Sequence, residues 1–170
     1  LGDRPVIAED LGYLTDSVRR LVADCGFPGM KVLEFAFDSR DASSAEYLPY
    51  RYTPNCVVYT GTHDNETVAG WYQSIRPEER RAVCRYLNRA PDAVEPLHWD
   101  LLCAAMASVA KWCILPMQDC LGLDNRARMN HPSTLGGNWR WRVADDALTP
   151  ALAARLRAVT ETYGRLPAGR

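Results

Sequence analysis

The chain has 170 residues, of which 47% are hydrophobic and 24% are charged, the proportions of an ordinary globular protein with a buried core. Its formal net charge of -1 gives no electrostatic basis for binding nucleic acid or an anionic membrane. No stretch is apolar over the roughly 18 residues that a membrane span needs. The first residue is Leu and no signal or transit segment is recognisable. We therefore expect a cytoplasmic protein and a chain that is the internal or C-terminal part of something longer.

The six cysteines show no C-x-x-C pair and no zinc-finger spacing with histidine. Most of them fall in apolar helical or strand patterns, which favours small core residues kept reduced. No phosphate-binding loop, dinucleotide fingerprint, nucleophile elbow or zinc-protease motif is present. The sequence therefore predicts no metal and no organic cofactor.

The first elements alternate strand and helix, which is typical of an α/β fold. Residues 6–8 form a short apolar run that predicts a buried strand leading directly into Glu9. A helix is predicted to begin after Thr15 or Asp16, either of which can cap it, and to end at Gly26.

The middle of the chain repeats this alternation. Residues 30–37 predict a second strand that ends at Asp38, and the β-branched run at residues 55–60 predicts a third. A short helix is expected over about residues 65–72. Another should begin at Pro77, because Pro is favoured at the first helical position and acidic residues follow it.

The last part of the chain contains the longest helical pattern, at residues 95–111, and a fourth predicted strand at residues 112–117, followed by Asp119. A terminal helix is expected from residue 149 to about residue 163. Between them, residues 121–143 predict a long irregular loop. Loops of this length in compact domains are usually functional. Because this one follows the end of a predicted strand, we expect it to lie on the catalytic rim.

Four such units favour adjacent parallel strands, and two assemblies fit them: an open doubly wound sheet, or half of a (β/α)8 barrel. The chain is shorter than the roughly 250 residues of a whole barrel. Because the carboxyl ends of parallel strands meet at one rim, we expect the acids that follow the four strands to cluster there. These acids are Glu9, Asp38, Asp64 and Asp119.

Paired carboxylates at one rim suit the hydrolysis or transfer of a glycosidic bond, with Glu9 and Asp64 as the leading candidates. Each also has a structural interpretation. Glu9 fits a solvated loop carboxylate or a charge at a helix N-terminus, and Asp64 fits a helix N-cap. His63 and Asp64 together could hydrogen-bond a sugar diol, whereas a metal-dependent phosphohydrolase would need further ligands.

Two sets of side chains could add contacts to such a site. Residues 125–131 are rich in hydrogen-bond donors that could orient a carboxylate or a sugar hydroxyl, or could simply be solvated. The tryptophans could stack on sugar rings, although core packing is the expected role for Trp71, Trp99 and Trp112. Packing is also favoured for Trp139 and Trp141.

Six motifs in register resemble one known family over nearly the whole chain. They read IAEDLG at residues 7–12, FPGMKVL at 27–33, FAFD at 35–38, GTHDN at 61–65, ARMN at 127–130 and GNWRWR at 137–142. Their order resembles that of the 4-α-glucanotransferases, the amylomaltases or plant disproportionating enzymes of glycoside hydrolase family 77. A single motif of this length would be weak evidence, whereas six in order are specific.

The resemblance implies both a fold and residue roles. The fold would be the C-terminal half of a (β/α)8 barrel, with residues 1–170 forming about strands 5 to 8 of a partial catalytic domain. Glu9 would be the general acid/base and Asp64 the transition-state stabiliser. His63, Asp38 and Asn130 would contact the substrate.

The implied reaction transfers segments of α-1,4-glucan between maltooligosaccharides and glucose, with retention, by double displacement. The family's nucleophile is an Asp in an Arg-x-Asp-His context upstream of the acid/base, and no such context precedes Glu9. The chain alone is therefore expected to be inactive and to need the N-terminal half of the barrel as its partner. Two alternatives are an amylase-like hydrolase and a half-barrel that only binds glucan or a partner chain.

Overall fold

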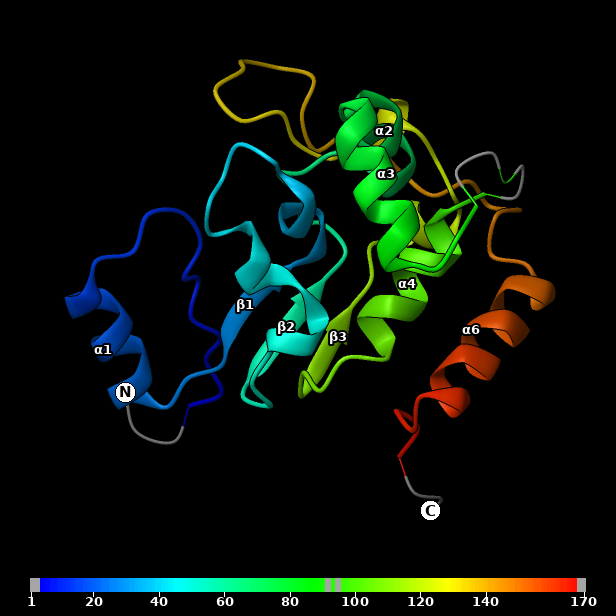
Figure 1. Ribbon diagram of the computed structural model, residues 1–170. Coiled ribbons are helices and arrows are strands. Elements are labelled where there is room, and N and C mark those ends of the chain that lie inside the picture. The colour runs from blue at the N-terminus through cyan, green and yellow to red at the C-terminus, as the bar shows by residue number, and fades with distance from the viewer. Residues whose placement is uncertain (1–3, 91–92, 94–95, 168–170) are drawn as a thin grey trace.

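The computed structural model describes residues 4–90, 93 and 96–167 and is built on a parallel sheet (Figure 1). Its three strands lie side by side in the order β1 (Gly29–Val32), β2 (Cys56–Tyr59) and β3 (Trp112–Ile114). Gly29 pairs with Cys56 across the first boundary, and Val57 pairs with Trp112 across the second. The chain is thus an α/β protein with parallel strands, as the alternating pattern predicts.

Helices connect and cover these strands in the described part of the chain. The α-helices are α1 (Asp16–Cys25), α2 (Val68–Ser74), α3 (Pro77–Tyr86), α4 (His98–Met106), α5 (Met117–Cys120) and α6 (Pro150–Thr162). The 3-10 helices are η1 (Leu33–Phe37), η2 (Ser44–Tyr47), η3 (Pro49–Arg51) and η4 (Asn125–Ala127).

The capping residues at the ends of α1 and α6 confirm the sequence prediction. The side chain of Thr15 accepts a hydrogen bond from the backbone of α1, and Thr149 does the same for α6. Gly26 follows α1 with a φ of 67°, in the left-handed conformation that glycine adopts most easily.

The predicted strand at residues 6–8 is wrong. This segment joins the start of β1 through one backbone hydrogen bond, from Ala8 N to Pro28 O at 2.9 Å, and has no strand geometry. A strand needs a ladder of such bonds, and one bond does not hold an extended segment in register. The sheet therefore has three strands in the described residues, where the sequence predicts four.

Two other predicted strands are correct at their start but too long. After Val32 the chain coils into η1, because a 3-10 turn places residues three apart on one side and so buries both Leu33 and Ala36. The strand that begins at Trp112 ends at Ile114, since α5 starts directly after Pro116. Short apolar runs do not distinguish strand from tight helix by periodicity, which explains both errors.

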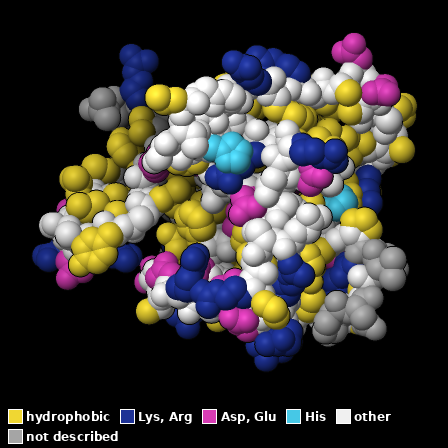
Figure 2. Space-filling model, turned by 90° about the horizontal axis from the view of Figure 1, so that it is seen from above, with side chains coloured by type: hydrophobic (Ala, Val, Ile, Leu, Met, Phe, Trp, Pro, Cys, Tyr) yellow, Lys and Arg dark blue, Asp and Glu magenta, His cyan; other side chains and the backbone are white. Residues whose placement is uncertain are grey.

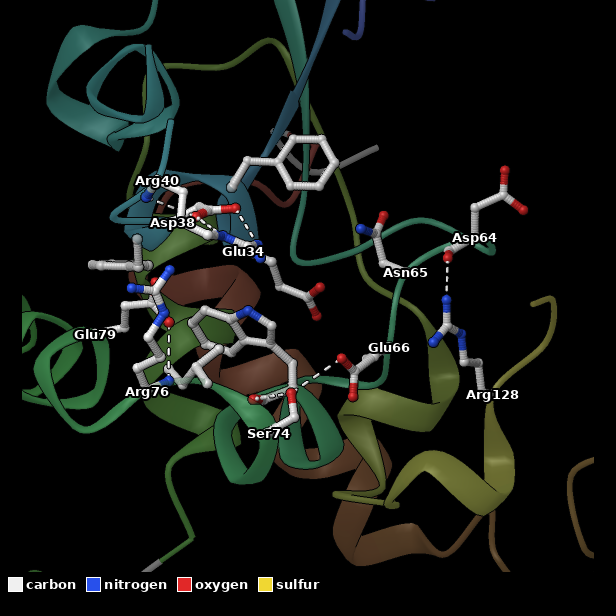
Figure 3. A pocket seen from close by; sticks show the side chains of 14 residues that line it. Glu34, Asp38, Arg40, Asp64, Asn65, Glu66, Ser74, Arg76, Glu79 and Arg128 are labelled. Atoms are coloured by element: carbon white, nitrogen blue, oxygen red, sulfur yellow. Dashed lines mark hydrogen bonds and ion pairs between the residues drawn. The ribbon is translucent and has the colours of Figure 1, made fainter. Parts of the chain in front are cut away.

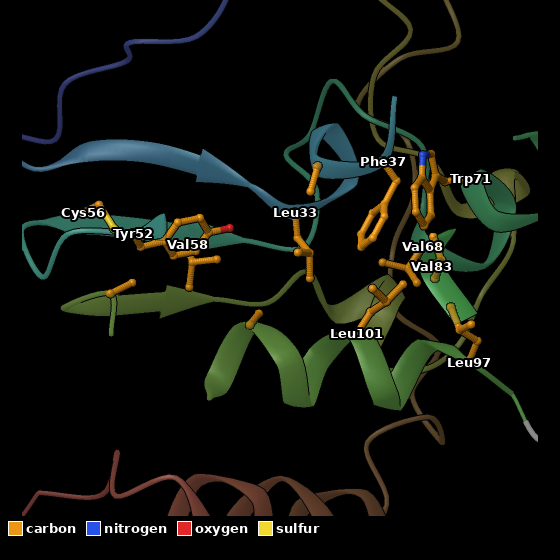
Figure 4. Packing of buried hydrophobic residues seen from close by; sticks show 13 residues of the cluster. Leu33, Phe37, Tyr52, Cys56, Val58, Val68, Trp71, Val83, Leu97 and Leu101 are labelled. Atoms are coloured by element: carbon orange, nitrogen blue, oxygen red, sulfur yellow. The ribbon is translucent and has the colours of Figure 1, made fainter. Parts of the chain in front are cut away.

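The core lies between the sheet and the helices α2, α3 and α4 (Figure 4). Leu101 of α4 packs there with Leu33, Val68 and Val83, all nearly inaccessible to solvent. The opposite side of α4 buries Trp99 and Leu102 against α6 in a second cluster. Because α4 is covered on both sides, it is apolar around most of its circumference, as a buried helix must be.

Helix α1 lies apart from the other helices, on the side of the sheet opposite α6 (Figure 1). None of its residues is buried, and hydrophobic side chains gather on that side of the surface (Figure 2). The exposed ones include Tyr13, Val18 and Leu21. Among all the helices of the described residues, α1 included, none is both long enough and apolar enough to cross a membrane.

Candidate active site

The turn that follows β2 carries His63 and Asp64. Asn65 shapes this turn, because its side-chain oxygen accepts hydrogen bonds from the backbone N–H of Thr62 at 2.9 Å and from the Thr62 hydroxyl at 2.7 Å. Asp64 is not the N-cap of α2. Thr67 holds that position and accepts a hydrogen bond from Gly70 N. The Asp64 carboxylate is therefore available for other contacts.

A segment far along the chain holds this turn in place. Asn130 Nδ2 donates to Asp64 Oδ1 at 2.6 Å, and Asn130 N donates to His63 O at 3.1 Å. Arg128 donates to two backbone carbonyls, Asp64 O at 2.6 Å and Asn130 O at 2.9 Å. The His63 Nε2 lies 3.3 Å from Asp64 Oδ1. The ARMN motif thus fixes the geometry of the turn that carries His63 and Asp64.

A polar pocket of about 400 Å³ opens between this turn, η1, the C-terminal half of α2 and the start of α3 (Figure 3). Acidic and basic side chains are also interspersed across the face of the molecule seen in Figure 2. The residues that line the pocket are Glu34, Phe35, Phe37, Asp38, Arg40, Asp64, Asn65, Glu66, Trp71, Ser74, Ile75, Arg76, Glu79 and Arg128. The pocket therefore joins Asp38 and Asp64 at one end of the sheet.

Glu34 is a pocket residue that the sequence analysis missed. It is only 5% exposed, and among the residues that the structure describes its Oε1 finds no hydrogen-bond partner. Burial raises its pKa well above the ordinary value, and the nearby carboxylates Asp119 and Glu66 raise it further, against the opposing charge of Arg128. A carboxyl within the apolar run of residues 30–37 is the signal that could have identified it.

The pKa of Glu34 predicts a pH-dependent stability. The pKa of Glu34 is higher in the folded chain than in the unfolded chain, where it is about 4.3. The neutral carboxyl therefore contributes its full stability below the unfolded pKa. That contribution is lost as the pH rises through the folded pKa. We expect Glu34→Gln to match the wild-type chain near pH 4 and to become increasingly more stable than wild type at higher pH. The difference should grow by at most about 1.4 kcal/mol per pH unit.

Urea unfolding of both chains at several pH values measures this difference. The exposed Glu46 provides the control, because Glu46→Gln should stay within about 0.5 kcal/mol of wild type at every pH. If the stability advantage of Glu34→Gln over wild type shrank as the pH rises, the raised pKa of Glu34 would be contradicted.

Asp38 lies at the end of η1 and is held by Arg40. The guanidinium donates to both carboxylate oxygens, at 2.8 and 2.7 Å, and these hydrogen bonds lower the pKa of Asp38 to about 2. The buried carboxylate of Glu79 accepts hydrogen bonds from the backbone N–H of Ser39 at 3.0 Å and from its hydroxyl at 2.8 Å. Asp38 is thus an ionised, firmly positioned group at the pocket wall.

Asp119 has a structural role and does not line this pocket. It is 1% exposed, and its two oxygens accept hydrogen bonds from the Thr60 hydroxyl at 2.5 Å and from Val68 N at 2.8 Å. It therefore ties α5 to the end of β2 and the start of α2. Across the described residues, no three side chains of His, Cys, Asp or Glu are grouped as metal ligands would be.

Comparisons with known proteins place this geometry in a family. A family model described as 4-alpha-glucanotransferase matches residues 1–149. The chain belongs to the 4-alpha-glucanotransferase family. The chain is 47% identical to the 4-alpha-glucanotransferase of Synechocystis over 97% of its length and 45% identical to that of Thermus thermophilus over 97%. It covers 32% and 34% of those proteins, so it spans about a third of the length of these relatives.

A solved family structure agrees with the fold. The amylomaltase from Streptococcus agalactiae, in complex with acarbose, matches with a TM-score of 0.91 and 40% identity over 98% of this chain and 33% of that one. An amylomaltase from Corynebacterium glutamicum, at 20% identity and a TM-score of 0.61, shares the fold. The resemblance found in the six motifs is therefore confirmed.

Not all residues that the 4-alpha-glucanotransferase resemblance implies come together. His63, Asp64 and Asn130 form one hydrogen-bonded group, and Asp38 lines the same pocket as Asp64. Glu9 does not line that pocket. It is exposed, and the carboxylate of its neighbour Asp10 accepts from Met30 N at 2.6 Å, which places this pair beside β1 rather than beyond its carboxyl end. The expected cluster of four acids thus reduces to Asp38 and Asp64.

Arg128 is expected to control the position of Asp64 in this candidate site. Lys has a single ammonium group and does not reproduce the two-carbonyl contact of the guanidinium. Because a hydrogen bond from a charged group contributes about 1.5–3 kcal/mol, Arg128→Lys should lower kcat/KM roughly tenfold or more. Steady-state assays of a transferase containing this segment measure it, with the exposed Arg126→Lys as the control. Equal losses in both variants would refute the assignment.

Proposed function

We propose that this chain forms part of a 4-α-glucanotransferase that breaks an α-1,4-glucan bond and transfers the glycosyl unit to another glucan with retention. The observation that carries the proposal is the Asp64 carboxylate. Asn130 hydrogen-bonds this carboxylate, and Arg128 hydrogen-bonds the Asp64 backbone carbonyl, at the end of β2 beside a polar pocket, in a chain that belongs to this family. Maltooligosaccharides and glucose are the proposed substrates.

In the proposed mechanism Glu9 protonates the leaving glycosidic oxygen. At the same time a carboxylate from the other half of the barrel, outside this chain, attacks the anomeric carbon. Glu9 then removes the proton from the incoming 4-hydroxyl, which releases the covalent glycosyl intermediate to the acceptor. Asp64 stabilises the positive charge that develops on the sugar ring. His63, Asp38 and Asn130 hydrogen-bond the sugar hydroxyls.

We also propose that residues 1–170 are a partial (β/α)8 catalytic domain with a rim loop at residues 121–143, completed by the other half of the barrel. The parallel order β1-β2-β3 with helical crossovers supports this arrangement. So does the outer strand β3, where Trp112 and Ile114 are each 44% exposed. Apolar side chains on an outer strand are normally covered by a further layer of protein.

A chimaeric enzyme tests the proposed function. This chain replaces the segment that it matches in the Thermus thermophilus 4-alpha-glucanotransferase, and the product is incubated with maltotriose. Formation of maltooligosaccharides longer than maltotriose, seen by chromatography, is the expected result.

Two other outcomes separate the alternatives. Glucose and maltose without longer products would indicate an amylase-like hydrolase. A folded but inactive chimaera that still binds maltotriose would indicate a half-barrel that binds glucan without catalysis. The unmodified relative serves as the positive control, and the 170-residue chain by itself is expected to be inactive because it has no assigned nucleophile.

A further inference from the structure

The GNWRWR motif places an aromatic ring against the candidate site. The rings of Trp139 and His63 have centroids 5.0 Å apart and planes tilted by 38°. Trp139 also lines a second, smaller pocket together with His63 and Asp119. Trp139 lies 76 positions beyond His63 in the sequence, so the fold alone brings the two rings together.

The backbone at Trp139 has a strained, left-handed conformation. Its φ is 62°, in the left-handed region that residues with a side chain rarely adopt. Such a conformation persists only where surrounding contacts enforce it, and it concentrates at functional positions. Here Trp139 N donates to Met129 O at 2.7 Å, and Arg142 Nη1 donates to Trp139 O at 3.1 Å. The loop is thus anchored on both sides of the tryptophan.

The ring is well placed to restrain an otherwise mobile side chain. The His63 side chain is 55% exposed, and it contacts the Asp64 carboxylate and the Trp139 ring. An exposed imidazole with one long contact of 3.3 Å can rotate away from it. Packing of an aromatic face against the imidazole removes that freedom.

We propose that Trp139 is a positioning residue whose ring packs against His63 and thereby keeps its Nε2 directed at Asp64. This inference rests on the proposed function, since it assigns Trp139 to the same substrate-binding group. Trp139 acts through His63 and is not itself assigned a contact with the glucan.

Two variants distinguish the effect of losing the Trp139 ring from the effect of disturbing the loop that carries it. Trp139→Gly removes the ring but suits the left-handed backbone, so the loop should keep its conformation and the chain its stability. Trp139→Phe keeps an aromatic face. In NMR spectra of the 170-residue chain, the ring protons of His63 should lose their ring-current shift in Trp139→Gly and keep most of it in Trp139→Phe. Trp112→Phe, on the outer strand β3, should leave these signals unchanged.

Kinetics of the chimaeric transferase complete the test. Trp139→Gly should lower kcat/KM roughly two- to tenfold, and Trp139→Phe less. In a His63→Ala background Trp139→Gly should add no further loss, because its effect passes through His63. An equal loss in both backgrounds, or unchanged His63 signals in Trp139→Gly, would overturn the proposal.

The two measurements also distinguish this inference from the proposed function. If the unaltered chimaera transfers no glucan, the proposed function fails, and the His63 signals alone decide whether Trp139 orients the imidazole. If the chimaera is active while Trp139→Gly has wild-type kinetics, the inference about Trp139 fails alone.

Discussion

Glu9→Gln in the chimaeric transferase should lower kcat by about 10²–10⁴-fold, because general acid–base help is worth that much and the amide cannot exchange a proton. Binding of maltotriose should change far less, since the amide still hydrogen-bonds a sugar oxygen. Steady-state kinetics give kcat, and calorimetry with the inactive variant gives the affinity.

The exposed carboxylate of Glu46 provides a matched control for this change, because Glu46→Gln removes the same charge on the 3-10 helix η2. It should leave kcat unaltered. Wild-type turnover in Glu9→Gln would remove Glu9 from the mechanism. The result has particular weight because Glu9 lies beside β1 and outside the pocket that contains Asp64.

Leu101→Ala should lower the free energy of unfolding of the 170-residue chain by about 2–5 kcal/mol, the usual consequence of removing a buried leucine side chain. Leu101 is 1% exposed and packs in the main cluster on the sheet side of α4 (Figure 4). Alanine is a strong helix former, so the loss reflects the cavity rather than the helix. Urea unfolding monitored by tryptophan fluorescence measures it.

The fully exposed Leu135 in the long loop supplies the comparison. Leu135→Ala removes the same atoms without opening a cavity and should change stability by less than about 0.5 kcal/mol. Since whole domains are stable by only about 5–15 kcal/mol, the Leu101 variant should unfold at clearly lower urea. Similar midpoints for the two variants would contradict the core described here.

The sequence predicts this fold well where local chemistry has a single solution. Thr15 and Gly26 bound α1, because the threonine hydroxyl caps the first turn and glycine, which has no side chain, readily adopts the left-handed conformation that ends a helix. The run at residues 55–60 becomes β2 because its β-branched residues are buried on both faces. Residues 33–37 are different. A run of apolar residues also suits a 3-10 helix, and tertiary burial rather than periodicity decides between the two.

The site is predictable from motifs but not from local pattern. The local pattern alone predicts Asp64 to be a helix N-cap. In the structure Thr67 is the N-cap of α2, so the Asp64 side chain is available for other contacts. Its partner Asn130 is 66 residues away, a pairing that no local rule reveals. The sequence does not predict Glu34 as a pocket residue, because it lies within an apolar run. A carboxyl there becomes informative only once its burial is known. The packing role expected for Trp139 is only half correct, since the residue is 55% exposed and its ring lies against His63.

The order of the three strands has a consequence for how the chain folds. Gly29 pairs with Cys56 and Val57 with Trp112, so the second pairing closes a loop about twice as long as the first. Each doubling of loop length adds only about 0.6 kcal/mol of closure entropy, but non-local parallel pairings slow folding strongly. Docking of β3 should therefore be the late event, after β1 and β2 have paired. During synthesis the chain must emerge as far as Ile114 before its sheet can be completed.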